Sequence, residues 1–219
     1  MNQILNIFKT IIIIFFLTLI CGAKPYSNTG KPVDLRELYE VFQSKDLGKI
    51  KNTLNDISSM RHQGKLLGFL LDVWNQKKTK YPELSWSTLN KDIIRLNITN
   101  ILVQAKNNGF IEIDIKEMHK YVLSLVDVWD KELAGQAIRN LSLFRDQKDV
   151  PLLLSIAKRN ERSTFRYSIM ALSTMCIPSA LEALEKLKKS FTDKKIILYL
   201  EESIRKSKKL QKIGYCDDF

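Results

Sequence analysis

The sequence predicts an all-α protein in which antiparallel helix pairs stack beside one another. Three observations support this fold class. From Asp34 onward the apolar positions recur at helical spacing and do not alternate as they do in strands. Only 8 glycines and 5 prolines occur in 219 residues, few for an all-β fold that turns about every ten residues. Apolar residues make up 45% of the chain, which is enough for a sizeable core.

Residues 34–129 carry five helical stripes, which we take as a helical N-terminal part. They cover residues 35–42, 47–60, 66–74, 89 to the stop at 107–109, and 115–129. The third is apolar on nearly all sides, which predicts a central position. Asp114 with Glu117 three residues later predicts an N-cap and capping box for the fifth stripe. The alternating stretch from 110 to 115 has no partner strand in view and is expected to be an extended connector.

One motif occurs twice within this part. The apolar run that ends in Asp72-Val73-Trp74 is repeated 55 residues later, where it ends in Asp127-Val128-Trp129. We interpret the two as similar core helices, each closed by a tryptophan that fills a gap between neighbouring helices. A repeated ligand surface is the alternative.

Beyond Asp130 the helical segments are shorter and come in pairs. Three segments align by their small and apolar positions: residues 133–144, 164–175 and 196–207, which begin 31 and then 32 residues apart. Such a period is typical of helical-pair repeats. Pro151 and Pro178 lie between the aligned segments, each where a helix is expected to begin, because the first helical turn does not need the missing N–H.

Residues 130–208 resemble HEAT repeats of the short bacterial type, through this spacing and the small–apolar–x–small–Leu pattern of Ser168-Ile169-x-Ala171-Leu172. The resemblance implies a HEAT-like α-solenoid over residues 130–210, followed by a tail at 211–219. The family usually has an Arg near the start of the second helix of each pair. Here the equivalent positions hold other residues, with Arg166 one position late, so we expect repeats packed mainly by apolar contacts. Those positions are Ala134, Phe165 and Ile197.

Residues 1–23 have the order of a secretory signal peptide. A basic Lys9 precedes the apolar run at 10–20, and the small residues that follow predict cleavage after Ala23. The apolar run of about eleven residues is shorter than the ~20 that span a bilayer. Two alternatives stay open: lipidation of Cys21, against which the bulky Ile20 argues, and a retained membrane helix. Residues 24–33 read as a flexible leader, and the protein is expected to be exported to the periplasm, the cell envelope or the medium.

The sequence contains few candidate catalytic or metal-binding residues. His62 and His119 have no histidine or carboxylate at the i+4 spacing that suits a helical metal site. There is no G-x-S-x-G motif and no Gly-rich phosphate loop. We therefore expect no enzymatic activity, no cofactor and no metal. Cys176 and Cys216 could form a disulfide in an oxidising compartment, with a free tail thiol or an intermolecular bond as alternatives.

Charge is the strongest functional signal, because the net charge is +11 and basic residues concentrate near the C-terminus. This patch is the predicted docking surface for a protein or an anionic envelope component. The alternative explanation is a solvated terminal repeat that keeps the array soluble and blocks further stacking. A HEAT-like nucleic-acid-binding protein is the alternative function if the N-terminus is not an export signal. The candidate docking residues are Lys186, Lys188, Lys189, Lys194, Lys195, Arg205, Lys206, Lys208 and Lys209.

Overall fold

The computed structural model describes residues 34–44, 46–59, 64–75 and 88–212. The chain divides into two units, Met1–Val33 and Asp34–Phe219, and every described residue belongs to the second. The expected signal peptide, the leader and the last seven residues of the tail lie outside the described residues. All regular secondary structure in the described ranges is helical, which confirms the all-α class. No helix among them has the length and apolarity needed to cross a membrane.

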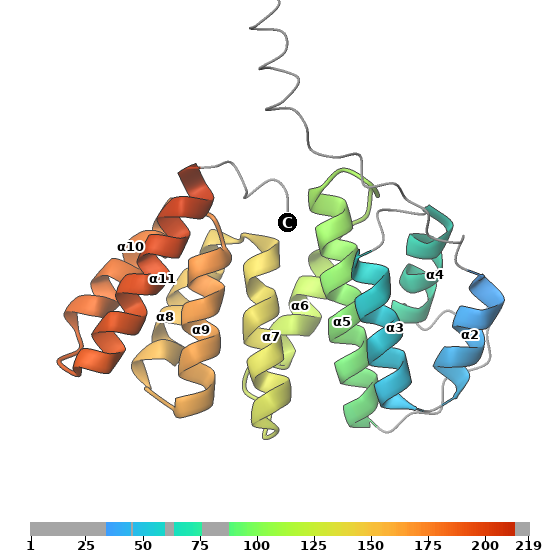
Figure 1. Cartoon of the computed structure of the whole chain (residues 1–219), viewed down its shortest axis with the longest axis horizontal. Coiled ribbons are helices and arrows are strands. Elements are labelled where there is room, and N and C mark those ends of the chain that lie inside the picture. Colours follow the sequence, from blue (N-terminus) through green and yellow to red (C-terminus); the bar gives the residue numbers. More distant parts are fainter. Residues whose placement is uncertain (1–33, 45, 60–63, 76–87, 213–219) are drawn as a thin grey trace, which may run out of the picture. The chain divides into compact units, whose positions relative to one another are not determined.

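The helices α2 to α11 follow one another along the chain (Figure 1). Their bounds are α2 Leu35–Gln43, α3 Leu47–Ser59, α4 Gly64–Trp74, α5 Thr88–Asn107, α6 Lys116–Ser124, α7 Lys131–Phe144, the 3-10 turn η1 Gln147–Asp149, α8 Val150–Lys158, α9 Arg162–Thr174, α10 Pro178–Lys189 and α11 Lys194–Lys212.

Local chemistry explains where several helices begin. Asp34 and Asp130 are N-caps whose side chains accept hydrogen bonds from main-chain N–H groups of the first turn. Asp193 does the same for the first turn of α11, with its Oδ1 2.7 Å from the nearest main-chain nitrogen. Pro151 and Pro178 lie in the first turns of α8 and α10, as the sequence predicts.

At three helix ends a residue other than glycine adopts a left-handed main-chain conformation. Arg145, Asn160 and Cys176 follow α7, α8 and α9 and have φ angles of 52°, 53° and 59°. This left-handed region is the usual way to end a helix, and glycine normally fills it because it has no Cβ. Three successive turns of this chain therefore reverse direction at residues that carry side chains.

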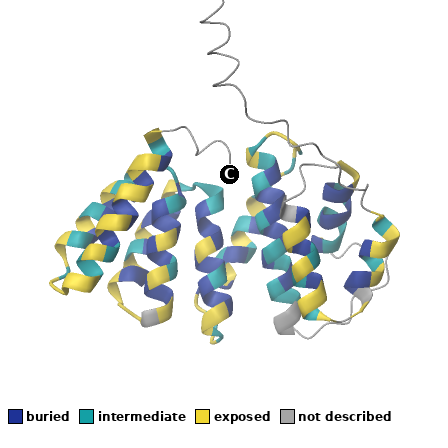
Figure 2. Ribbon diagram, viewed as in Figure 1, coloured by how far each residue is buried: buried dark blue, intermediate teal, exposed yellow. Residues whose placement is uncertain are grey.

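The helices contact one another in a regular order along the chain (Figure 1). α3 contacts α5, α5 contacts α7, α7 contacts α9, and α9 contacts α11. The intervening helices α4, α6, α8 and α10 each pack against the helix that follows them. A core cluster lies between helices α5 to α11 and runs from Leu96 to Ile204, and Figure 2 shows buried residues on the helix faces that meet neighbours. The apolar stripes of the sequence thus become inter-helix contacts.

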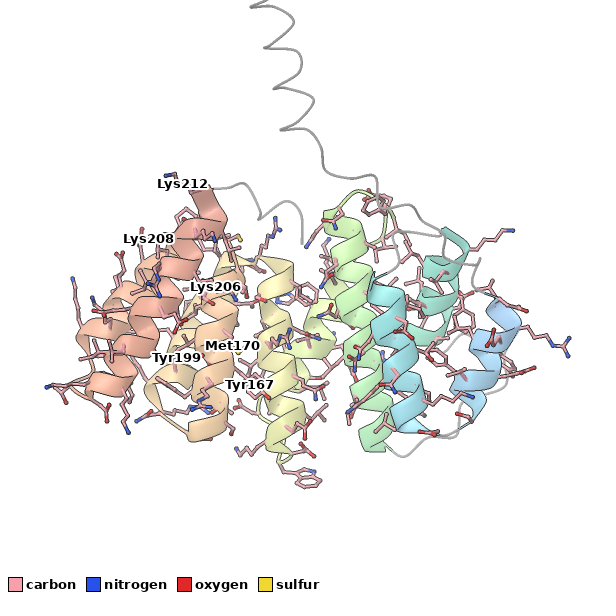
Figure 3. The ribbon with its side chains drawn as sticks, in the orientation of Figure 1. Tyr167, Met170, Tyr199, Lys206, Lys208 and Lys212 are labelled. Carbon is pink, nitrogen blue, oxygen red and sulfur yellow. The ribbon has the colours of Figure 1, made fainter. Side chains whose placement is uncertain are left out.

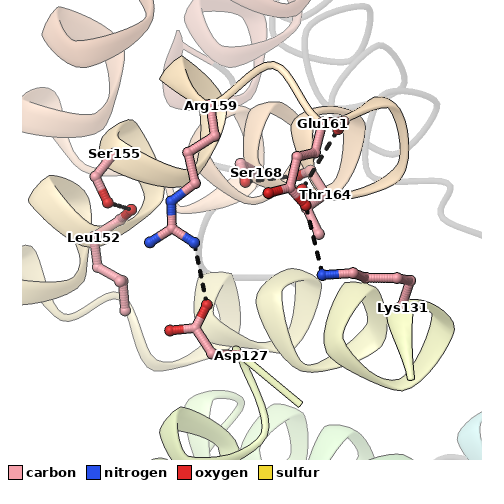
Figure 4. Close-up of polar contacts among 8 residues, drawn as sticks. All are labelled: Asp127, Lys131, Leu152, Ser155, Arg159, Glu161, Thr164 and Ser168. Atoms are coloured by element: carbon pink, nitrogen blue, oxygen red, sulfur yellow. Dashed lines mark hydrogen bonds and ion pairs between the residues drawn. The ribbon is translucent and has the colours of Figure 1, made fainter. Parts of the chain in front are cut away.

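Ion pairs connect the start of α7 with the turn between α8 and α9 (Figure 4). Arg159 Nη1 lies 3.3 Å from Asp127 Oδ1, and Lys131 Nζ lies 3.6 Å from Glu161 Oε2. All four side chains are largely exposed to solvent, so each pair adds at most about 1 kcal/mol. Packing between these helices rests mainly on apolar contacts, since the helix faces that meet belong to the apolar cluster.

The structure corrects two details of the fifth stripe. The helix expected to reach residue 129 ends at Ser124, and Trp129 lies in the connection to α7 with 86% of its surface exposed. The interpretation of Trp129 as a core residue is therefore wrong, whereas Trp74 is 6% exposed. Asp114 accepts a hydrogen bond from the main-chain nitrogen of Lys116 at 2.9 Å, but the N-cap position belongs to Ile115.

Candidate binding groove

A polar hollow runs over α3, α5, α7, α9 and α11. It consists of two adjoining cavities of about 510 and 190 Å³ that share Asn100, Gln104, Arg139 and Asn140. We call these joined cavities the amide groove. The first is lined by Lys51, Leu54, Asn55, Leu96, Asn97, Asn100, Ile101, Gln104, Gln136, Arg139, Asn140 and Tyr167. The second adds Asn107, Ser142, Leu143, Arg145, Met170, Thr174 and Lys206.

Helix α5 supplies one row of carboxamides to the groove. Asn97, Asn100, Gln104 and Asn107 are spaced by three or four residues, which places them on one face of the helix. At a rise of 1.5 Å per residue this row is about 15 Å long. Gln136 and Asn140 on α7 are also four residues apart and line the same groove. Two neighbouring helices therefore present amide side chains to one hollow.

In most of these amides the side-chain nitrogen donates a hydrogen bond within the protein. The Nδ2 groups of Asn97, Asn107 and Asn140 donate to main-chain carbonyls at 2.8, 2.9 and 3.0 Å. Gln104 Nε2 donates to Asn100 Oδ1 at 2.7 Å. In the described part of the chain, the amide oxygens of Asn97, Asn107, Asn140 and Gln104 then accept nothing. They form a set of fixed, neutral acceptors that a ligand with N–H or O–H donors would satisfy.

The charge of the groove has one sign. Lys51, Arg139 and Lys206 line it, and none of the three has an ion-pair partner among the described residues. No aspartate or glutamate occurs among the described residues that line either cavity. An anionic group that enters the groove therefore meets cations without competition from an internal carboxylate.

Tyr167 is the aromatic residue of the groove, and a glycine determines its place. A Cβ added to Gly135 of α7 would lie 2.3 Å from two atoms of the Tyr167 ring, far inside van der Waals contact. The ring thus packs directly on the main chain of α7. Figure 3 shows Tyr167 and Met170 on α9 and Lys206 on α11, on the side of the helices that faces the viewer.

The predicted docking lysines lie on α10 and α11, and of these only Lys206 lines the amide groove. Two of the others are engaged in ion pairs. Lys188 Nζ is 3.2 Å from Glu201 Oε1, and Lys208 Nζ is 2.9 Å from Glu185 Oε1. The hydrogen bond from Lys208 lowers the pKa of Glu185 below its usual value. The C-terminal patch is therefore partly neutralised by its own glutamates.

Of the cysteines named in the predictions, only Cys176 lies among the described residues. Cys176 is disulfide-bonded. Cys216, the predicted partner, and Cys21, the possible lipidation site, lie outside the described residues. The Cys176–Cys216 pairing stays a prediction.

A second polar cluster joins α6 to the turn before α8. His119 Nε2 lies 2.8 Å from Asp149 Oδ2, and His119 Nδ1 lies 4.0 Å from Asp146 Oδ2. The His119 ring also packs against Phe144, with ring centroids 4.7 Å apart. One ligand atom from each of the three polar residues lies within 4.8 Å of the others, a donor set that a divalent metal could accept. The hydrogen bond to Asp149 already accounts for the arrangement. Spacing along α6 could not reveal it, because both aspartates come from another part of the chain.

Replacing Asp149 with asparagine is expected to change how stability depends on pH. Burial raises the pKa of the Asp149 carboxyl group, partly opposed by the hydrogen bond from His119. A raised pKa means that the folded state binds the proton more tightly. The resulting stabilisation is complete below the unfolded pKa of about 3.9 and is lost as the pH rises through the folded value, at about 1.4 kcal/mol per unit of difference.

The test of this expectation is urea unfolding between pH 3.5 and 5.5. The wild-type chain should lose stability relative to Asp149→Asn as the pH rises through this window. Parallel curves for the two proteins would contradict the assignment.

The fold and the groove define a helical protein with a polar, cationic hollow. Comparison of the chain with protein-family models, curated proteins and solved structures found no match in any of the three. Its function is therefore argued from its own residues.

Proposed function

We propose that this protein is a non-enzymatic binding module that docks a partner in the amide groove. The observation that carries the proposal is the composition of that groove. Among the described residues it has fixed amide acceptors, the cations Lys51, Arg139 and Lys206 without a described ion-pair partner, and no lining carboxylate. Such a lining supplies hydrogen bonds and positive charge. Among the described lining residues, the hydroxyl groups of Ser142 and Thr174 donate to main-chain carbonyls, and no hydroxyl is hydrogen-bonded to a side chain that could act as a general base.

The order of helix contacts supports a solenoid as the scaffold for this module. We infer that α7 to α11 are HEAT-like helix pairs and that α2 to α6 continue the same stack. The support is that α3, α5, α7, α9 and α11 each contact the next in this series, while α4, α6, α8 and α10 each pack against the helix that follows. In such an array the apolar stripes are buried between repeats and one face stays available for a ligand. The groove lies on helices that follow one another in this contact order, α3, α5, α7, α9 and α11.

The place of action follows from the N-terminal pattern. We propose that residues 1–23 direct export and that the partner is a protein or anionic component of the cell envelope. Mass spectrometry of the native N-terminus distinguishes the three possibilities. Lys24 as first residue indicates cleavage, an acylated Cys21 indicates a lipoprotein, and an intact Met1 indicates a retained helix or no export.

Site-specific photo-crosslinking in the producing cell tests where the partner docks. A benzoylphenylalanine at Gln136, inside the groove, is expected to give a defined adduct with a macromolecule, and Arg139→Glu in the same chain should abolish it. The matched control places the same crosslinker at Lys189, which is exposed on α10 outside the groove. Adducts from Lys189 and none from Gln136 would move the docking surface to the C-terminal lysines and overturn the groove proposal.

A further inference from the structure

The groove has two kinds of hydrogen-bonding group, and together they restrict what can fill it. Its fixed acceptors are neutral amide oxygens, at Asn97, Asn107, Asn140 and Gln104. A ligand must bring donors to them, since an amide oxygen that is desolvated without a donor costs about 1–3 kcal/mol. Phosphate and sulfate groups bring only acceptors. A purely phosphate-based contact, with a nucleic-acid backbone or a lipid headgroup, therefore leaves these oxygens without partners.

The second kind of group is cationic. Arg139 and Lys51 lie in the larger cavity with the Tyr167 ring, and no carboxylate among the described lining residues neutralises them. Arg139 is exposed and without a described partner, so its guanidinium can take a carboxylate through two parallel hydrogen bonds. A neutral oligosaccharide would bring hydroxyl donors but would leave this charge unused. The ligand has to carry both neutral donors and negative charge.

From these two requirements we propose that the amide groove binds an extended, acidic segment of a partner protein. The groove recognises the main chain of this segment through hydrogen bonds. This inference rests on the proposed docking function and specifies its ligand. Peptide N–H groups donate to the amide oxygens, and a ligand carboxylate pairs with Arg139. The Nδ2 group of Asn100, whose oxygen is taken by Gln104, donates to a peptide carbonyl. The recognised class is a polypeptide with Asp or Glu side chains.

The dimensions of the groove agree with a short segment. An extended chain rises about 3.3 Å per residue, so the ~15 Å row on α5 corresponds to about five residues. A carboxamide combines N–H donors with a C=O acceptor, the same two kinds of group that a peptide offers, which makes it suited to main-chain contacts that tolerate varied side chains. The carboxylate contact then selects acidic segments from among all extended chains.

Fluorescence anisotropy with the full-length chain tests the inference. The probes are two pools of fluorescein-labelled, amidated octapeptides, one with three Glu or Asp at random positions and one with three Gln or Asn. The acidic pool should bind at least about tenfold more tightly, the ratio expected for a charge-assisted bond. The tightest acidic sequence should lose at least about tenfold when its alternate peptide nitrogens are methylated, because methylation removes the N–H donors and keeps the charge.

Protein variants separate the groove from general charge. Arg139→Gln and Asn100→Ala should each weaken binding of the acidic peptide by about tenfold. Lys209→Gln removes one exposed cation outside the groove and should leave the affinity within twofold. Thermal unfolding of every variant checks that the fold is retained. An affinity that falls equally in Arg139→Gln and Lys209→Gln would overturn the inference, since net charge alone would then explain binding.

Three further probes keep this inference distinct from the docking proposal: a (dT)20 oligonucleotide, phosphatidylglycerol vesicles and oligogalacturonate. If one of them binds, the peptides do not, and Arg139→Gln abolishes binding, the groove is a docking site and the peptide inference is wrong. If the N-methylated peptide binds as well as its parent, main-chain reading is wrong. If neither Arg139→Gln nor Asn100→Ala changes the binding of any probe, the groove is not the docking site and both proposals fail.

Discussion

Replacing Trp74 with alanine is expected to lower the free energy of unfolding by about 3–5 kcal/mol. The Trp74 side chain is 6% exposed, and its Nε1 donates to Thr99 Oγ1 at 2.9 Å. The guanidinium of Arg95 lies 4.5 Å from the centroid of the Trp74 ring and 4.0 Å from that of Tyr121. Removing the indole therefore opens a cavity where α4, α5 and α6 meet. It also removes one of two rings that hold a largely desolvated cation.

Trp129 provides the matched control, because it ends the second copy of the same sequence motif. Its side chain is 86% exposed, so Trp129→Ala should change the free energy of unfolding by less than about 0.5 kcal/mol. Urea unfolding followed by far-ultraviolet circular dichroism measures both variants under the same conditions. Equal losses in the two proteins would contradict the described placement of the tryptophans.

The contact between Gly135 and Tyr167 predicts a reversal of sign in a double-mutant cycle. Gly135→Ala should destabilise the wild-type chain by about 1–3 kcal/mol, because the new methyl group collides with the Tyr167 ring and overpacks the contact between α7 and α9. In a Tyr167→Ala chain the same change should stabilise by about 0.5–1 kcal/mol, since alanine is favoured over glycine within a helix and the ring is gone.

Chemical denaturation of the four proteins gives the coupling between the two positions. A destabilisation by Gly135→Ala that is the same with and without the tyrosine ring would show that the ring lies elsewhere. The acidic-peptide assay adds a second readout, because a displaced Tyr167 changes the wall of the amide groove.

Much of the fold could be predicted from residue spacing. The stripes at 35–42 and 47–60 correspond to α2 and α3, and Pro151 and Pro178 mark the beginnings of α8 and α10, because helix periodicity and the first-turn tolerance for proline are local properties. The exposure of Trp129 could not be predicted from residue spacing. Its motif matches that of Trp74, but burial depends on where the next helix packs, and α6 ends five residues before Trp129.

The candidate site could not be predicted in the same way. Charge density pointed to the C-terminal lysines, because clustered cations are visible in a linear sequence. The amide groove draws its residues from five helices, and carboxamides such as Asn97 and Asn140 attract no notice one at a time. A signal was present in the spacing of Asn97, Asn100, Gln104 and Asn107, which repeats polar, uncharged side chains along one helix face. The pairing of that face with α7 required the fold.

The order of helix contacts also bears on how the polypeptide reaches its native state. The helix contacts described above join each helix to a neighbour one or two places further along the chain. Loops that close between such neighbours are short, and the entropy lost in closing a loop grows with its length. Proteins with mainly local contacts fold fast. Assembly of this helical region can thus proceed one hairpin at a time, without waiting for distant segments to find each other.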